Sequence, residues 1–263
     1  MDSMSFDPIA SVYDTTRVFD QKCFDSALDY LVERFPPSKF PGLFEPGVGT
    51  GRIAIPFAQR GYRVTGVDIS EEMLQRLAEK LKRVELPIEF QKADVTRLPF
   101  ADAAFDIVVV VHLFHLIPDW KTAVREVFRV LRPGAPLIFM NTGDGTEVPF
   151  INQRYAALCA EFGQAAERLG PSRKSDEIMD YLSSLGKSAE KVEDRWQWTH
   201  RIPVDKALSY MRSRSSSLTN IVTDDVHQKA CDQLERELTK QYPGPAAEVE
   251  VSNEIKFIIV LPA

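Results

Sequence analysis

The stretch Leu43-Phe44-Glu45-Pro46-Gly47-Val48-Gly49-Thr50-Gly51-Arg52 decides the fold. It begins as the end of an apolar strand, passes through an acid and then places three glycines at alternate positions. Glycine lacks a Cβ, so the chain can turn sharply there and come close to a ligand. The residues that follow favour a helix over 50–60. A strand, a glycine loop and the beginning of a helix predict a row of free backbone N–H groups directed at a ligand.

On both sides of this stretch the chain alternates between apolar strands and amphipathic helices. Alternation of this kind predicts a parallel sheet wound by right-handed crossovers. The continuous apolar run at 105–111 is typical of a strand that is covered on both faces. We expect strands at 43–45, 63–68, 88–93, 105–111 and 136–140, and helices at 23–34, 50–60, 71–81 and 120–131.

Polar side chains follow the ends of several predicted strands. Glu45, Asp68, Asp94 and His112 lie at or just past the carboxyl ends. In sheets of this class, ligands bind outside those ends, where the strand order reverses. We therefore expect the four side chains to converge on one site.

After residue 140 the alternation stops. The serines at 213 and 215–217 are expected in a loop, and His200 and His227 carry no motif and are expected on the surface. The patterns predict helices at 150–169, 175–185, 204–214 and 224–241, and strands at 196–201 and 254–260.

Composition limits the class of protein. The net charge of −6 over 263 residues argues against a broad nucleic-acid-binding surface, which needs a concentrated basic face. Three widely separated cysteines offer no metal-ligand spacing and no disulfide framework, so we expect no metal and a reducing compartment. With no signal-like segment and no apolar run long enough to span a bilayer, we expect a cytoplasmic protein, monomeric or homodimeric, without a membrane span.

Two classes of cofactor use a strand, glycine loop and helix. The dinucleotide pattern G-x-G-x-x-G places a pyrophosphate on the helix N-terminus. Here the third glycine of that pattern is replaced by Arg52, and the carboxylate of Glu45 precedes the loop. A carboxylate repels a pyrophosphate but suits a ligand that carries an amino group, so the spacing disfavours NAD.

The run Glu45-x-Gly47-x-Gly49-x-Gly51 resembles the first motif of class I S-adenosylmethionine-dependent methyltransferases. Further motifs of that family follow in order, and the similarity covers about residues 40–140. It is closest to the subset that includes the ubiquinone and menaquinone biosynthesis methyltransferases. The later motifs are Val67-Asp68-Ile69-Ser70 with Met73, Ala93-Asp94-Val95 with Leu98-Pro99-Phe100 and Phe105-Asp106, and Val130-Leu131-Arg132-Pro133-Gly134-Ala135.

The resemblance implies a Rossmann-like, doubly wound α/β fold with a mostly parallel seven-stranded sheet. The last strand would run antiparallel. We expect a single methyltransferase domain, with a helical cap over 1–40, a cofactor-binding core over 41–140 and a helical lid over 141–190 that covers the acceptor site. Residues 191–263 would complete the sheet.

The resemblance also implies how S-adenosylmethionine would bind. The loop from Gly47 to Gly51 would lie against its methionine portion, with Glu45 before it, and the backbone near His112 would meet the methionine end. Asp68 would bind both ribose hydroxyls, since a carboxylate can accept two hydrogen bonds. The remaining contacts would be Ile69 and Met73 on the adenine face, Asp94 and Val95 at the adenine edge, and Tyr13 and Arg17 from a closing N-terminal segment.

The expected reaction is methyl transfer to an O, N or C nucleophile of a small-molecule acceptor. His112 or His115 could act as a general base, because the pKa of histidine lies near neutrality. Transfer from a sulfonium needs little such help, so alignment is the larger contribution. The alternatives are a non-catalytic S-adenosylmethionine-binding protein and an NAD-dependent oxidoreductase.

Overall fold

The computed structural model describes residues 3–7, 10, 13–15, 19–142, 148–165, 170–171, 176–214, 217–244 and 247–260. Its seven strands form one sheet in the order β3-β2-β1-β4-β5-β7-β6. They are β1 (Gly42–Pro46), β2 (Arg63–Asp68), β3 (Ile88–Lys92), β4 (Ile107–Val111), β5 (Leu137–Thr142), β6 (Ala189–Pro203) and β7 (Glu248–Val260).

Strands β1 to β5 are parallel, and β7 pairs antiparallel with both β5 and β6. The predicted α/β fold with an antiparallel last strand is confirmed. The strand order reverses between β1 and β4, which places the switch point beside the glycine loop. The site therefore has to be sought at the carboxyl ends of these two strands.

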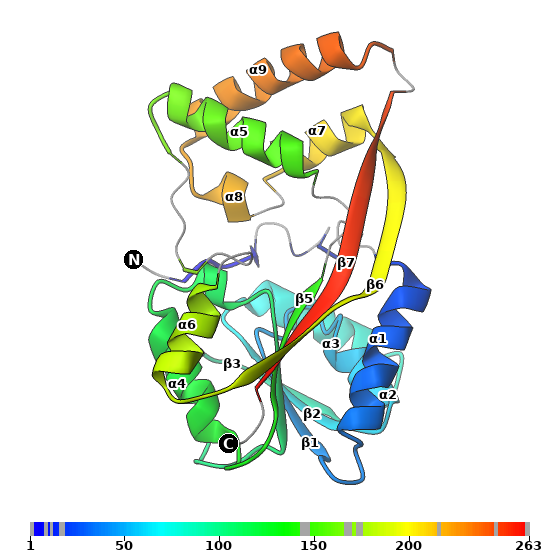
Figure 1. Cartoon of the computed structure of the whole chain (residues 1–263), viewed down its shortest axis with the longest axis vertical. Coiled ribbons are helices and arrows are strands. Elements are labelled where there is room, and N and C mark those ends of the chain that lie inside the picture. Colours follow the sequence, from blue (N-terminus) through cyan, green and yellow to red (C-terminus); the bar gives the residue numbers. More distant parts are fainter. Residues whose placement is uncertain are drawn as a thin grey trace.

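Helices cover both faces of the sheet (Figure 1). One face packs against α1 (Gln21–Arg34), α2 (Ala54–Gln59) and α3 (Glu71–Leu81), and the other against α4 (Trp120–Val130) and α6 (Glu177–Ser184). Alternate residues of β4 belong to the two cores, with Ile107 and Val109 on one side and Val108 and Val110 on the other. This confirms the prediction that β4 is covered on both faces.

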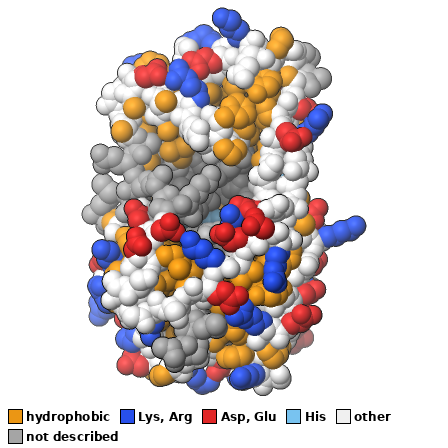
Figure 2. All heavy atoms as spheres, in the orientation of Figure 1, with side chains coloured by type: hydrophobic (Ala, Val, Ile, Leu, Met, Phe, Trp, Pro, Cys, Tyr) orange, Lys and Arg blue, Asp and Glu red, His pale blue; other side chains and the backbone are white. Residues whose placement is uncertain are grey.

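A third hydrophobic core packs against the outer ends of β6 and β7, in what we call the helical module. It consists of α5 (Pro149–Glu161), α7 (Val204–Arg212), α8 (Ser217–Asn220) and α9 (Asp224–Gln241). The long β6–β7 ribbon carries it above the core (Figure 1). On the face drawn in Figure 2, hydrophobic side chains gather over the module, while acidic and basic side chains are interspersed below it.

Several predicted boundaries were wrong. Helix α2 begins at Ala54 rather than residue 50, because the loop continues through Gly51, whose N–H bonds to the Val48 carbonyl. Helix α5 ends at Glu161, where Gly163 adopts a left-handed φ of 91°; part of the predicted extension to 169 lies outside the described residues. Strands β6 and β7 both extend far beyond the core, and α8 occupies part of the predicted serine loop.

The two helices predicted as one lid lie in different places. Helix α5 packs in the helical module against α9. Helix α6 packs on the sheet side, where Tyr181 stacks edge-on against Trp120 of α4 with ring centroids 5.1 Å apart. Among the described residues no helix is long and apolar enough to cross a membrane.

Gly51 provides a test of how tightly the glycine loop packs. Its φ is +76°, and an added Cβ would lie 2.4 Å from Cδ1 of the fully buried Leu77. We expect Gly51→Ala to lower the free energy of unfolding by about 3 kcal/mol, from backbone strain plus overpacking. Gly163→Ala is the control, since its φ is +91° with no atom within 4 Å of the added Cβ. Urea denaturation should show a loss of only about 1 kcal/mol for the control; equal losses would contradict the packing argument.

Candidate cofactor and methyl-transfer site

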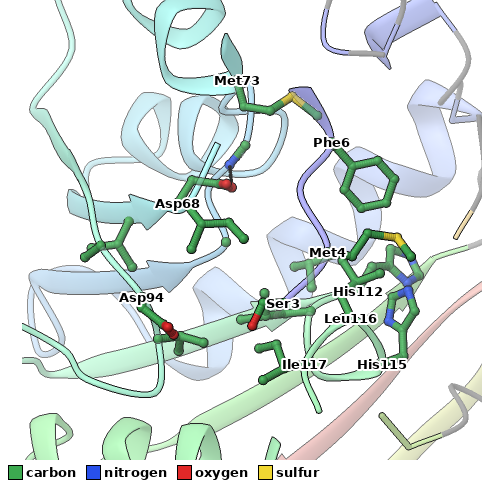
Figure 3. A pocket seen from close by; sticks show the side chains of 18 of the residues that line it. Ser3, Met4, Phe6, Asp68, Met73, Asp94, His112, His115, Leu116 and Ile117 are labelled. Carbon is green, nitrogen blue, oxygen red and sulfur yellow. Dashed lines mark hydrogen bonds between the residues drawn. The ribbon is translucent and has the colours of Figure 1, made fainter. Parts of the chain in front are cut away.

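A cavity lies at the carboxyl ends of β1, β2 and β4, at the predicted switch point (Figure 3). The space at this site, with the open solvent at its mouth included, amounts to about 960 Å³. Most of the predicted site residues line it. These are Tyr13, Gly47, Gly49, Asp68, Ile69, Met73, Asp94, Val95, His112 and His115.

Asp68 ties the glycine loop to the end of β2. Its Oδ2 accepts a hydrogen bond from the Gly49 N–H at 2.9 Å, and its Oδ1 accepts one from the Ser70 N–H at 2.9 Å. Burial raises the pKa of Asp68, and these two N–H donors oppose that rise. Each oxygen has more than one lone pair, so the carboxylate can still accept hydrogen bonds from a ligand.

The expected row of free N–H groups is not present. The N–H groups of Gly47 and Val48 both donate to the Val67 carbonyl, at 2.8 and 2.9 Å, and that of Gly51 donates to Val48. With Gly49 donating to Asp68, the loop is satisfied within the protein at these four positions. The prediction failed at these positions because the end of β2 accepts three of the donors and the loop itself accepts the fourth. Such a loop offers little to a pyrophosphate, which counts further against a dinucleotide.

Asp94 lies at the end of the cavity opposite the two histidines. Its Oδ1 accepts from both the N–H and the hydroxyl of Thr96, each at 2.8 Å, so Asp94 also closes a turn. Figure 3 shows Asp68 and Asp94 on one side of the cavity and the two histidines on the other. Met73 is 3% exposed and lines the cavity while packing in the protein, a position compatible with the expected contact on the adenine face.

Residues 3–7, which we call the N-terminal strap, form a wall of the cavity. The resemblance implies a closing N-terminal segment, but it points to Tyr13 and Arg17 and not to these residues. The strap bonds to the core through the Met4 N–H, which donates to the Leu116 carbonyl at 3.0 Å, and through Asp7, which accepts from the Ser70 hydroxyl. Figure 3 shows its side chains crossing the cavity. The lining residues that the sequence analysis missed are Ser3, Met4, Phe6, Val67, Ala93, Val111, Leu113, Leu116 and Ile117.

The missed residues have a common cause. Most are apolar and carry no motif, so only their position next to a predicted polar residue could have drawn attention to them. Val67, Ala93, Val111 and Leu113 each adjoin a predicted site residue in the chain. Ser3, Met4 and Phe6 of the strap carry no motif of their own, so the expected closing segment could not be assigned to them.

Two of the predicted residues do not line the cavity. Gly51 packs against Leu77 instead, and Glu45 is buried behind the loop at 2% exposure. Glu45 Oε2 is a buried side-chain oxygen with no hydrogen-bond partner. Burial raises the pKa of Glu45 well above its usual range, although the charge of nearby Arg52 opposes the rise. Arg17 lies outside the described residues.

His112 and His115 both line the cavity, with ring centroids 6.5 Å apart and planes nearly perpendicular. His112 follows β4 and has a left-handed φ of 47°. Its Nε2 lies 2.7 Å from the Thr142 hydroxyl and accepts the Thr142 N–H at 3.2 Å. The two histidines predicted as possible bases thus meet the cavity, one of them held by the end of β5.

The expectation for His227 was wrong. It is only 7% exposed and lies in the core of the helical module, with Nδ1 2.7 Å from the Tyr155 hydroxyl. Burial lowers the pKa of His227. The helical pattern of α9 turns this position inward, a signal that a search limited to motifs passes over. Among the described residues, no group of three or more His, Cys, Asp or Glu side chains could hold a metal ion.

Comparison with known proteins agrees with the fold and with the resemblance to methyltransferases. The family described as "Methyltransferase domain" matches residues 44–139, close to the segment whose motifs carried the resemblance. The chain is 30% identical to 27-O-demethylrifamycin SV methyltransferase of Amycolatopsis mediterranei over 203 residues, which are 73% of this chain and 71% of that one. It is 33% identical to demethylmenaquinone methyltransferase of Thermus thermophilus over 116 residues, 43% of this chain and 51% of that one.

Solved structures share the fold at low identity. The YcgJ protein of Bacillus subtilis superposes with a TM-score of 0.61 at 17% identity, over 90% of this chain and 98% of that one. Phospholethanolamine N-methyltransferase 2 of Haemonchus contortus was solved with phosphomonomethylethanolamine and S-adenosylhomocysteine. It superposes with a TM-score of 0.54 at 15% identity, over 98% of this chain and 57% of that one.

A seven-stranded sheet of this order with an acid after β2 and a glycine loop after β1 defines a class I methyltransferase. The chain belongs to the S-adenosylmethionine-dependent methyltransferase family. Its cofactor is S-adenosylmethionine, and its reaction is methyl transfer. The cavity fits that cofactor, because it joins a carboxylate that can accept from hydroxyl groups to an apolar wall of Ile69 and Met73.

The burial of the Glu45 carboxyl leads us to predict how the stability of the fold depends on pH. Because its pKa is raised in the folded protein, the folded state keeps a proton that the unfolded chain releases above about pH 4.5. Stability is therefore lost as pH rises between the unfolded and folded pKa values, by up to about 1.4 kcal/mol per pH unit. Glu45→Gln cannot titrate, so between about pH 5 and pH 8 it should lose less stability than the wild type.

The measurement is urea denaturation of the cofactor-free protein at both pH values. Glu79→Gln serves as the control, because it removes an exposed carboxylate that pairs with Arg76 on the surface of α3. Its stability should follow the pH dependence of the wild type. Parallel pH dependences for the wild type and Glu45→Gln would show that Glu45 is ionised in the folded protein throughout this range.

Proposed function

We propose that the chain methylates a small molecule with an apolar body and no phosphate group. The walls of the cavity at its histidine end support this, since Leu113, Leu116 and Ile117 contribute apolar side chains. Asp68 and Asp94 are the charged residues among the described lining, which includes no lysine or arginine. Recognition of a phosphate normally uses such cations.

The cofactor would be held with its ribose at Asp68 and its adenine between Ile69, Met73 and Asp94. Bound S-adenosylmethionine supplies a methyl group activated by a sulfonium. The protein's own part is to align the acceptor with that group at the end of the cavity walled by His112 and His115, and to keep water out with the N-terminal strap. The helical module, carried over this end by β6 and β7, would cover the acceptor.

The ribose assignment can be tested with S-adenosylhomocysteine. Asp68→Ala removes two charge-assisted hydrogen bonds to the ribose hydroxyls. We therefore expect the Kd of this variant for S-adenosylhomocysteine to be about 100-fold higher than that of the wild type. Asp102→Ala is the control, since Asp102 is an exposed acid paired with Arg129. Isothermal titration, with circular dichroism to check folding, measures both. Unchanged binding by folded Asp68→Ala would refute the ribose assignment.

The acceptor class needs a turnover experiment. With methyl-labelled S-adenosylmethionine, we expect label to pass to a phenol, quinol or similar apolar acceptor and not to phosphoethanolamine, because the described cavity has no cation for a phosphate. Formation of S-adenosylhomocysteine is the readout. Preferential transfer to phosphoethanolamine would contradict the proposal, and binding of cofactor without turnover on any acceptor would favour the non-catalytic alternative.

A further inference from the structure

Gly170 lies directly against the backbone of the loop that carries His115. A Cβ added to Gly170 would stand 2.1 Å from the carbonyl oxygen of Phe114 and 2.9 Å from that of Ile117. It would also lie 3.1 Å from the Cα of His115. All three neighbours are backbone atoms, which cannot turn aside as the end of a flexible side chain can. A residue larger than glycine therefore fits at position 170 only if the two segments move apart.

The loop that Gly170 touches is a wall of the cavity. Leu113, His115, Leu116 and Ile117 all line the cavity at its histidine end, and we call residues 113–117 the histidine wall. Gly170 is not among the described residues that line the cavity. It therefore contacts the backbone of the histidine wall without itself facing a bound ligand.

The histidine wall is held at other points as well. Phe114 is 3% exposed, and its ring packs against Phe139 of β5 with centroids 5.8 Å apart. The Met4 N–H of the strap donates to the Leu116 carbonyl at 3.0 Å. The sheet, the strap and Gly170 thus each fix a different part of the wall. The cavity is open space next to the wall, into which the wall can move.

The chain at position 170 has little freedom of its own. Gly170 belongs to the connection that runs from α5 in the helical module to α6 on the sheet. Pro171 follows it and is buried, and a proline restricts the backbone of the residue before it. A methyl group added at position 170 is therefore accommodated more easily by movement of the histidine wall into the cavity than by retreat of Gly170.

We propose that Gly170 is a positioning residue that sets the distance between the histidine wall and the bound cofactor, and thereby the size of the acceptor that fits. A methyl group at position 170 would press the wall inward by about 1 Å, the change needed to bring the Phe114 oxygen to ordinary contact. Smaller acceptors would then be favoured. The position of the wall does not depend on the proposed function, whereas the assignment of this end of the cavity to the acceptor rests on it.

The position of the wall can be read without turnover. Methyl ¹H–¹³C spectra of the protein saturated with S-adenosylhomocysteine report on Ile117 in the wall and on Met73 at the cofactor end. We expect Gly170→Ala to shift the Ile117 signals and to leave the Met73 signal in place. Gly186→Ala is the control and should shift neither, since its φ is +69° and no atom lies within 4 Å of the added Cβ. Unchanged Ile117 signals in folded Gly170→Ala would overturn the proposal, whatever the protein methylates.

A milder variant decides the matter if Gly170→Ala does not fold. Pro171→Ala adds no atom at position 170 but frees the backbone of Gly170, so the histidine wall loses part of its support. We expect a smaller shift of the same Ile117 signals, with the Met73 signal again unchanged. Spectra of folded Pro171→Ala that match those of the wild type would overturn the proposal in that case.

Selectivity between acceptors is the second readout. With phenol and 1-naphthol as acceptors, Gly170→Ala should lower the ratio of kcat/KM for 1-naphthol to that for phenol by about tenfold, the scale of a small change in an apolar pocket. The Kd for S-adenosylhomocysteine should stay the same. A merely structural role would lower the folded fraction and reduce both rates equally, so an unchanged ratio would overturn the proposal. A wild type that methylates neither compound would contradict the proposed acceptor class, and the methyl spectra would still decide the role of Gly170.

Discussion

The carboxylate of Asp68 stands where three elements of the fold meet. It ends β2, accepts the N–H of Gly49 from the loop after β1, and accepts the N–H of Ser70 at the beginning of α3. Without these two hydrogen bonds, the loop and the helix would each have a donor to satisfy near the cavity. One side chain thus fixes the backbone around the site and keeps further lone pairs, which we propose for the ribose of the cofactor. Because this position is buried, the pKa of Asp68 is raised.

The other elements of the fold lie around the Asp68 carboxylate. Parallel strands β1 to β5 bring the cofactor residues together at one edge, and the antiparallel β6–β7 ribbon carries a separately packed helical module above the core. The two ends of the cavity differ in chemistry. One has the carboxylates of Asp68 and Asp94, and the other has imidazoles and apolar side chains. A methyltransferase needs this division, because cofactor and acceptor must be recognised by different groups and still meet.

The core of the fold, and the polar residues that line the cavity at its strand ends, were predictable from the sequence. Local backbone geometry requires the glycines after β1, and the acids lie at the ends of β2 and β3. Both features can be recognised in the sequence as motifs next to periodic apolar segments. The hydrogen bonds from the glycine loop to Val67 and the place of Met4 at the cavity depend on contacts between residues far apart in the chain. Glu45 shows most clearly what a sequence motif leaves out. Its position in the motif is evident, but its burial behind the loop depends on how the folded chain packs.

The central claim is that one cavity holds S-adenosylmethionine with its ribose on Asp68 and its reactive end beside His112 and His115. A crystal structure with S-adenosylhomocysteine bound tests it most directly. We expect both ribose hydroxyls within hydrogen-bond distance of the Asp68 carboxylate and the sulfur at the histidine end of the cavity. A cofactor bound elsewhere, or in this cavity with its ribose away from Asp68, would contradict the account.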